Sequence, residues 1–176
     1  DWLESLELAT PAGTQYLRVC IDELRYHRQQ RTQVTKSLRT LVRSSDINRI
    51  IKLLCSVPGI GFVTAITFYA ELVDMDRFSR ADRLASFVGL VPSVSGSGTT
   101  EHVRGLTKRR NRYLRYLIIE AAWAAVRKDE ALLYSFNQLT KRMKKQEAII
   151  RIARKLLNRL RYVWSKEVPY CPGVVD

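Results

Sequence analysis

Apolar residues recur at helical spacing along almost the whole chain, and this pattern predicts an all-α protein. From Leu17 to Val42 the apolar positions favour one long amphipathic helix that ends near Ser44. The middle of this helix, residues 25–31, is nearly all polar, so we expect it to project as an arm. Two interpretations of the arm stay open: a coiled coil for self-association, or a helix packed back on its own domain.

Shorter amphipathic segments follow the arm and predict a compact helical domain. Asp46, Ser79 and Thr107 are suitable N-caps for three of its helices, and Gly89 is a suitable C-terminal stop. The segments expected to be helical are residues 47–56, 62–72, 80–88, 108–125, 132–139 and 149–163.

Residues 91–106 interrupt the helical pattern with a run rich in Ser, Gly and Thr. A long irregular loop inside a compact domain is typically functional or disordered, and no strand is predicted here or elsewhere. The expected organisation is an arm over 1–46, a domain over 47–166 and a tail over 167–176 that is loose from Pro169.

The net charge of +13 is unevenly placed along the chain. Residues 1–100 carry 12 Lys and Arg against 10 Asp and Glu, whereas residues 101–176 carry 18 against 7. This asymmetry predicts a polyanionic partner, DNA, for the C-terminal part. A basic surface that only keeps the protein soluble is the alternative. No apolar run approaches the ~20 residues that cross a bilayer, so no membrane span is expected.

Cysteine and histidine usage points away from disulfides and metal sites. Cys20, Cys55 and Cys171 are widely spaced, which favours free thiols in a reducing cytoplasm. His27 and His102 are also far apart, so no metal site is expected in this chain. The first residues have neither signal-peptide features nor an initiating Met, which suggests a piece of a longer chain.

The run Val57-Pro58-Gly59-Ile60-Gly61 matches a helix-hairpin-helix pattern, with Leu54 before it and Ala65 after it. Both glycines are expected to permit a tight turn with backbone angles closed to other residues. The N–H groups that start the second helix would then face an anion, usually a nucleic-acid phosphate. Candidate DNA-binding residues are therefore Gly59, Ile60 and Gly61. A Gly-rich corner between two core helices is the alternative.

Cations crowd the start of the helix expected after Thr107. Each exposed cation at a helix N-terminus opposes the macrodipole by about 0.3–1 kcal/mol, so a bound anion would explain the pattern better than stability does. A solvated basic patch is the alternative. The candidate DNA-binding residues of this cluster are Arg104, Lys108, Arg109, Arg110, Arg112 and Arg115.

Several motifs occur in an order that resembles the C-terminal domain of one transposase group. They are the runs 57–61, 76–78, 84–93, 97–98 and 107–115. Together they are similar to the DEDD-type transposases of the insertion-sequence one-hundred-ten/one-hundred-sixteen family, over roughly residues 50–125. The long helix before them resembles the coiled-coil linker of that family.

The resemblance implies a full-length enzyme with an N-terminal resolvase-like domain that holds Mg²⁺ on four carboxylates and uses a guide RNA. It also implies a nucleophilic serine in the loop after Gly-Leu-x-Pro, which falls on Ser97, with Ser95 as the nearby alternative. The chain departs from the frequent Ser-Gly-Gly at Thr99, which could alter the flexibility of the loop. It departs from Lys-Arg-Gly-Asn at Arg110, which adds charge.

Two functions follow from these patterns. The first is the DNA-binding and strand-joining part of a bacterial insertion-sequence transposase, acting in the cytoplasm at the nucleoid. Ser97 would attack DNA, Mg²⁺ would come from the absent domain, and the chain alone would be inactive. The second is a non-catalytic nucleic-acid-binding module in which Ser97 is an ordinary loop residue. In the transposase, the arm is expected to support self-association.

Overall fold

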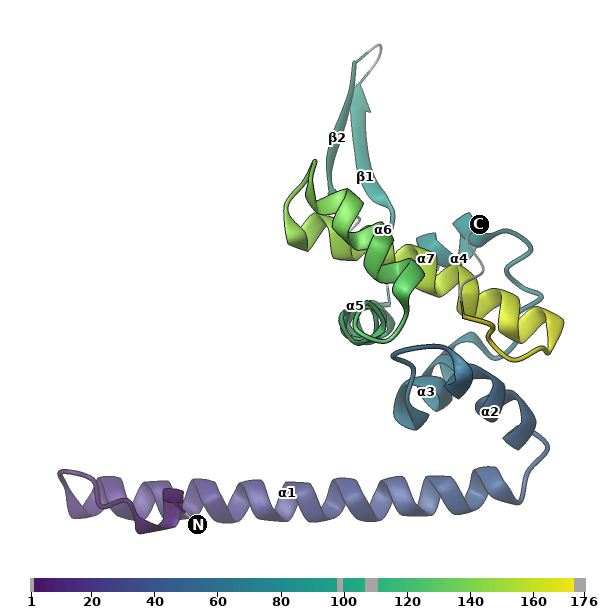
Figure 1. Cartoon of the computed structure of the whole chain (residues 1–176). Helices are drawn as coiled ribbons and strands as arrows, with labels where there is room; N and C mark the ends of the chain where they lie inside the picture. Colours follow the sequence, from purple (N-terminus) through teal and green to yellow (C-terminus); the bar gives the residue numbers. More distant parts are fainter. Residues whose placement is uncertain (1, 98–99, 107–110, 173–176) are drawn as a thin grey trace. The chain divides into compact units, whose positions relative to one another are not determined.

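The computed structural model describes residues 2–97, 100–106 and 111–172, and within 92–97 and 100–106 it describes only the backbone. The chain divides into two units, Asp1–Asp46 and Ile47–Asp176, each with its own set of internal contacts (Figure 1).

The first unit consists of a short 3-10 helix, η1 (Trp2–Ser5), and the long helix α1 (Pro11–Arg43). Thr10 starts α1, because its Oγ1 accepts a hydrogen bond from the amide of Gly13 at 3.1 Å. Arg25 forms an ion pair with Glu4, so the chain before α1 folds back along this helix. The predicted long helix that ends near Ser44 is confirmed.

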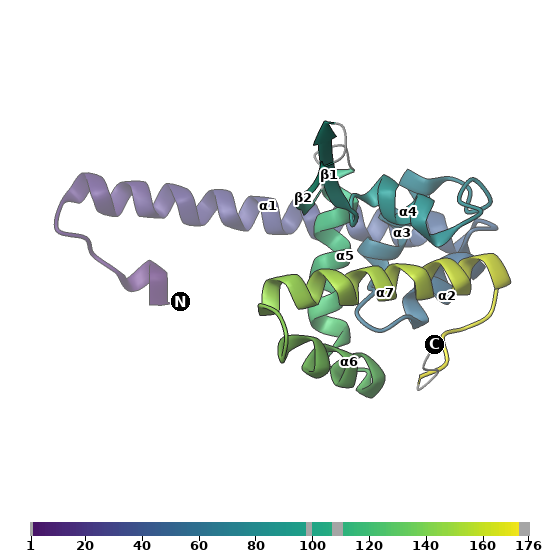
Figure 2. The same ribbon diagram turned by 90° about the horizontal axis from the view of Figure 1, so that it is seen from above.

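The second unit is built around its last helix. Its elements are α2 (Asn48–Ser56), α3 (Phe62–Leu72), α4 (Ala81–Val88), β1 (Pro92–Ser97), β2 (Thr100–Leu106), α5 (Arg112–Ala125), α6 (Glu130–Thr140) and α7 (Lys145–Lys166). Helix α7 contacts α2, α4, α5 and α6, and its predicted apolar stripe is buried (Figure 2). Near its end, the ring of Trp164 stacks on Tyr69 with 5.3 Å between the ring centres. The predicted all-α class is confirmed, because helices supply most of the buried core among the described residues.

The segment expected to be an irregular loop instead forms an antiparallel pair of strands, so the prediction of no strand was wrong. Ser97 pairs with Thr100 and Ser95 with His102, and the register shifts between Pro92 and Ser93. Pairing gives partners to backbone groups that a long loop would leave to solvent. The sequence signal was weak because Ser and Gly have little preference for strands.

Three expected N-caps are wrong by one or more residues. Helix α2 is capped by Ile47 and α4 by Arg80, each one residue after the expected position. Helix α5 is capped by Asn111, whose side-chain oxygen accepts hydrogen bonds from the amides of Tyr113 and Leu114. Thr107 lies outside the described residues. Gly89 does end α4, with a left-handed φ of 84° as expected.

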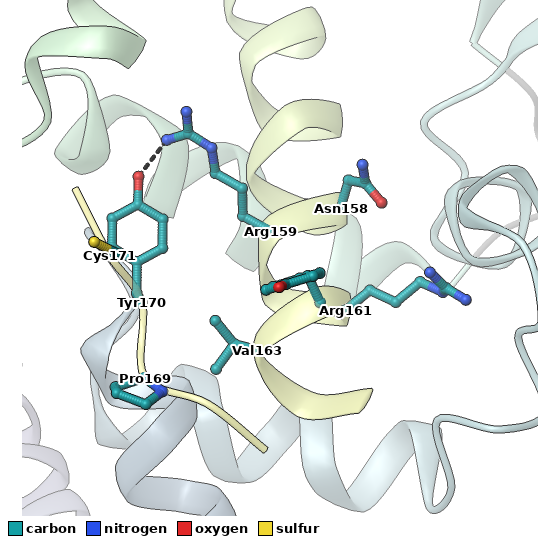
Figure 3. Close-up of a pocket in the computed structure, with 8 residues that line it drawn as sticks. Asn158, Arg159, Arg161, Val163, Pro169, Tyr170 and Cys171 are labelled. Carbon is teal, nitrogen blue, oxygen red and sulfur yellow. Dashed lines mark hydrogen bonds between the residues drawn. The ribbon is translucent and has the colours of Figure 1, made fainter. Parts of the chain in front are cut away.

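The tail was expected to be loose from Pro169, but Tyr170 is held by the domain. Its amide donates to Ser56 Oγ at 2.8 Å, and its hydroxyl donates to Asp129 Oδ2 at 2.5 Å. Arg159 also donates to the Tyr170 hydroxyl (Figure 3). These contacts come from α2, the start of α6 and α7. They hold Tyr170 in place although the tail has no regular secondary structure.

Candidate nucleic-acid interface

The turn between α2 and α3 is fixed by Gly59. The amide of Ile60 donates to the carbonyl of Val57 at 3.0 Å, which closes a four-residue turn with Pro58 second and Gly59 third. Gly59 has a φ of 80°, as the third position of a type II turn requires. A Cβ on Gly59 would lie 2.1 Å from the backbone oxygen of Ala121 in α5. Conformation and packing therefore both demand glycine here.

Gly61 has a different role from Gly59. Its φ of −94° and ψ of 174° suit any residue, and a Cβ built there would meet nothing within 4 Å. The expectation that the turn requires both glycines is thus confirmed for Gly59 and wrong for Gly61. The exposed, open space at Gly61 lies where α3 begins, at the positive end of its dipole. Ile60, the third candidate of this turn, is buried and anchors the turn in the core.

A shallow groove of about 420 Å³ lies over the turn. Besides the turn itself, it is lined by Cys55 and Ser56 at the end of α2, by Ala124 near the end of α5, and by Lys128 shortly after that helix. Lys128 is exposed, so it brings a cation to the groove where the helix dipole of α3 also favours an anion. Sequence reasoning missed Lys128, because only the packing of Gly59 on α5 brings residue 128 to the turn.

Arg112, a member of the other predicted cluster, lies at the first position of α5. Asn111, before α5, donates to Glu71 Oε2 near the end of α3 at 2.6 Å, whereas Gly59, before α3, packs on Ala121 late in α5. The two helices therefore run antiparallel, and Arg112 lies at the end of α5 away from the turn. In Figure 2, α5 runs from the base of β1 and β2 toward α6.

Only part of the basic cluster lies within the described side chains. Arg112 is exposed at the first position of α5, and Arg115 is half-buried one turn later. Arg104 lies in β2, where its backbone pairs with Ser93. Lys108, Arg109 and Arg110 lie outside the described residues. Among the described side chains, Arg112 is therefore the cation placed at the positive end of the α5 dipole.

Ser97 is the last residue of β1 and pairs with Thr100 of β2. It thus lies at the end of the hairpin away from Pro92, while Ser95 lies two pairs closer to Pro92 and opposite His102. Gly98 and Thr99 lie outside the described residues.

Asp129 fixes the corner between α5 and α6, directly after Lys128. Its carboxylate is buried, caps α6 through the amide of Leu132 at 2.8 Å, and lies 3.5 Å from Arg159 Nη1. Burial by itself raises the pKa of Asp129, but hydrogen bonds from Tyr170 and Leu132 and the charge of Arg159 hold this pKa below its usual range. Burial, followed by the hydrogen bond to Asp129, raises the pKa of Tyr170.

Arg161, on the same helix as Arg159, points away from Tyr170 (Figure 3). Its guanidinium donates to the backbone oxygens of Phe78 and Ser79, ahead of α4. Arg159 and Arg161 are therefore tied into the fold, and basic residues of α7 are not all available to a partner.

The described residues contain no group of three His, Cys, Asp or Glu side chains placed to hold a metal ion. Within the described part of the chain, Cys20, Cys55 and Cys171 form no disulfide. No helix within the described ranges is both long and apolar enough to span a membrane.

Comparison with known proteins identifies relatives of the chain. The family described as transposase IS116/IS110/IS902 matches residues 51–138. The chain is 30% identical over 174 residues to a probable family 20 transposase of Pseudomonas aeruginosa, which covers 97% of this chain and 50% of that protein. It is 43% identical over 72 residues to the transposase for insertion sequence element IS1111A of Coxiella burnetii, covering 41% and 20%. It is 28% identical over 131 residues to the insertion element IS110 uncharacterized 43.6 kDa protein of Streptomyces coelicolor, covering 74% and 32%. The chain thus spans half or less of the length of these relatives.

Proposed function

Because the chain belongs to the transposase IS116/IS110/IS902 family, we propose that it is the DNA-binding and strand-joining part of an insertion-sequence transposase. The observation that carries the proposal is the extent of the family match. Residues 51–138 include the turn at Gly59, the strand that ends at Ser97 and all of α5. The protein would act on DNA in the bacterial cytoplasm, at the nucleoid.

The turn at 57–61 is proposed to bind a phosphate of the DNA backbone. Gly61 leaves open space at the start of α3, and Lys128 supplies a cation to the same groove. Contacts of this kind position a duplex without reading its sequence. Arg112 and the other cations before α5 would hold a second part of the DNA, at the far end of α5.

Ser97 is the proposed nucleophile. Its Oγ would attack a DNA phosphorus and displace a deoxyribose hydroxyl, which takes up a proton as the serine–phosphate ester forms. Attack by the hydroxyl of another strand end would reverse the step, join the DNA and free the serine. A serine hydroxyl needs activation and a stabilised transition state. Arg104 and the cations at 108–112 are the candidates for stabilisation, and the activating group would come from the rest of a longer protein.

Three further features of the family resemblance are proposals for that longer protein. They are Mg²⁺ held on carboxylates outside this chain, a guide RNA, and self-association through α1. The last is supported by the apolar side chains that α1 exposes, which are Tyr16, Val19, Leu24, Tyr26, Val34 and Leu41. Accordingly, the chain alone would bind DNA and cleave nothing.

Salt-dependent binding tests the DNA-binding half of the proposal. Fluorescence anisotropy of this chain with labelled duplexes of unrelated sequence should show affinity falling steeply with salt. Each neutralised phosphate contributes about −0.9 to the log–log slope. An affinity that hardly changes with salt would contradict the proposal.

Substitution of Gly61 by Val tests the turn itself. The open space and extended backbone at Gly61 predict that Gly61→Val folds normally, at a cost of about 1 kcal/mol or less. Its Cβ branches would occupy the space offered to the phosphate, so affinity for all duplexes should fall alike. A folded Gly61→Val protein with unchanged affinity would leave the turn as a structural corner.

The second candidate function is a non-catalytic nucleic-acid-binding module. It needs only the phosphate contacts that the open space at Gly61 and the cation of Lys128 offer in the groove over the turn. The two candidates make the same prediction for DNA affinity. They differ over a covalent link between Ser97 and DNA, which only the transposase forms.

A further inference from the structure

Two tyrosines stand out on the exposed face of α5. Tyr113 is 53% and Tyr116 60% exposed, and within the described part of the chain neither ring has an aromatic or hydrogen-bonding partner. Two tyrosines elsewhere in the domain are used by the fold: Tyr69 stacks on Trp164, and Tyr170 bonds to Asp129. Tyr134 and Tyr162 are also exposed, but they do not lie beside the start of α5 in the sequence. The fold therefore gives no reason for two large aromatic rings at the start of α5.

Tyr113 and Tyr116 occupy neighbouring positions on the surface of α5. Residues three apart on a helix are neighbours, with about 5–6 Å between their Cβ atoms. The start of the helix is held rigidly, because Asn111 caps α5 through the amides of Tyr113 and Leu114 and also donates to Glu71. Leu114, between the tyrosines, is fully buried. Both rings are thus presented to solvent from a fixed piece of backbone.

The charges around the rings suit a polyanion. Arg112 is exposed directly before Tyr113. Glu71 of α3 brings one carboxylate to this end of α5, where it accepts a hydrogen bond from the side-chain amide of Asn111. Glu120 lies one turn beyond Tyr116, so the favourable charge is confined to the first turns of α5. Arg127 and Lys128 then follow beyond Glu120, with Lys128 in the groove over the turn.

We propose that Tyr113 and Tyr116 form a stacking platform for unpaired bases of a DNA strand whose phosphates are held by Arg112. Aromatic rings beside a basic surface bind single strands because every base can stack, whatever the sequence. The proposal rests on the proposed function, since strand joining needs DNA that has left its duplex. It goes further by assigning unpaired DNA to the start of α5 and duplex phosphates to the turn near its end. The length of α5, from Arg112 to Ala125 at about 1.5 Å per residue, separates the two.

Three DNA probes separate base stacking from charge. They are a labelled oligothymidine, a strand of the same length whose central sugars carry no bases, and a duplex. The variants, all in the 176-residue chain, are Tyr113→Leu with Tyr116→Leu, and Tyr113→Phe with Tyr116→Phe. Tyr134→Leu is the matched control, because Tyr134 is 66% exposed on α6 and has Glu130 four residues before it.

The double leucine variant should lose about tenfold or more in affinity for oligothymidine, because it removes two stacking rings. Its affinity for the base-free strand and the duplex should stay within about twofold, since the charges are unchanged. The double phenylalanine variant and Tyr134→Leu should bind like the wild type. Thermal melting of each variant should match the wild type, as both rings are exposed.

Equal losses for oligothymidine and the base-free strand, or wild-type affinity in the double leucine variant, would overturn the platform. Failure of the wild-type chain to bind any of the three probes would overturn the proposed function as well. The two failures are therefore distinct.

Discussion

A Cβ placed on Gly59 would lie 2.1 Å from the backbone oxygen of Ala121, so the turn before α3 is seated against α5 with no room for a side chain. We expect Gly59→Ala to cost about 2–4 kcal/mol of stability, because it adds a left-handed backbone penalty to a steric clash. Gly61→Ala, two residues away, should cost less than 1 kcal/mol. Urea unfolding of both variants measures the difference. Equal stability would contradict the separate roles of the two glycines.

Lys128 should contribute one phosphate contact to duplex binding. Lys128→Ala is expected to make the log–log salt slope shallower by about 0.9 without changing sequence preference. Lys141→Ala removes the same charge from an exposed lysine at the end of α6, away from the groove, and should leave the slope almost unchanged. If the two variants behaved alike, the groove over the turn would have no special role.

Asp129 should stabilise the domain far more than a surface acid. Asp129→Ala would leave Arg159, whose side chain is only 14% exposed, without its carboxylate and α6 without its cap. We expect a loss of about 3–5 kcal/mol. The control is Asp82→Ala, which breaks a second ion pair to α7, with Arg154, where both side chains are well exposed. That loss should be about 1 kcal/mol or less, as measured by denaturant unfolding.

The tail contact predicts a pH dependence of stability. The pKa of Tyr170 is raised in the folded protein. Its contribution to the free energy of unfolding is therefore complete below the ordinary tyrosine pKa of 10.0, and it is lost as pH rises through the folded pKa. The pKa of Asp129 is lowered, so its contribution is present above the ordinary 3.8 and is lost as pH falls through the folded value.

Melting temperatures of the wild type and Tyr170→Phe should be measured across the pH range. Their difference isolates the ionisation of the Tyr170 hydroxyl, because all other titrating groups are shared by the two proteins. The stability advantage of the wild type over Tyr170→Phe should shrink above about pH 10. A constant difference would show that the hydroxyl is not coupled to Asp129.

Helices were predictable from sequence because their signal is local. The apolar stripe of α7 and the bounds of α3 follow from spacing within each segment, and Gly89 marks the end of α4 as expected. The N-caps of α2 and α4 were each predicted one residue too early, at Asp46 and Ser79, because sequence patterns do not define a helix boundary to a single residue.

What the sequence did not reveal depends on contacts between distant residues. Asp129 meets Arg159 and Tyr170, which lie 30 and 41 positions away, so nothing in its own segment marks it as buried. The strand pairing of Ser95 with His102 has no strong local signal either. Lys128 reaches the groove over the turn because Gly59 packs against α5, a contact between residues distant in the sequence. The role of Ser97 still rests on the family resemblance.

The covalent step is tested most directly in the full-length transposase, with DNA carrying its insertion-sequence ends. After denaturation, the wild-type protein should carry a DNA strand attached to the peptide that contains Ser97, as detected by gel shift and mass spectrometry. Ser97→Ala should abolish both the adduct and strand cleavage while DNA affinity stays within a few-fold, and Ser95→Ala should retain the adduct. An adduct of wild-type yield in Ser97→Ala, or its loss only in Ser95→Ala, would contradict the assignment of Ser97 as the nucleophile.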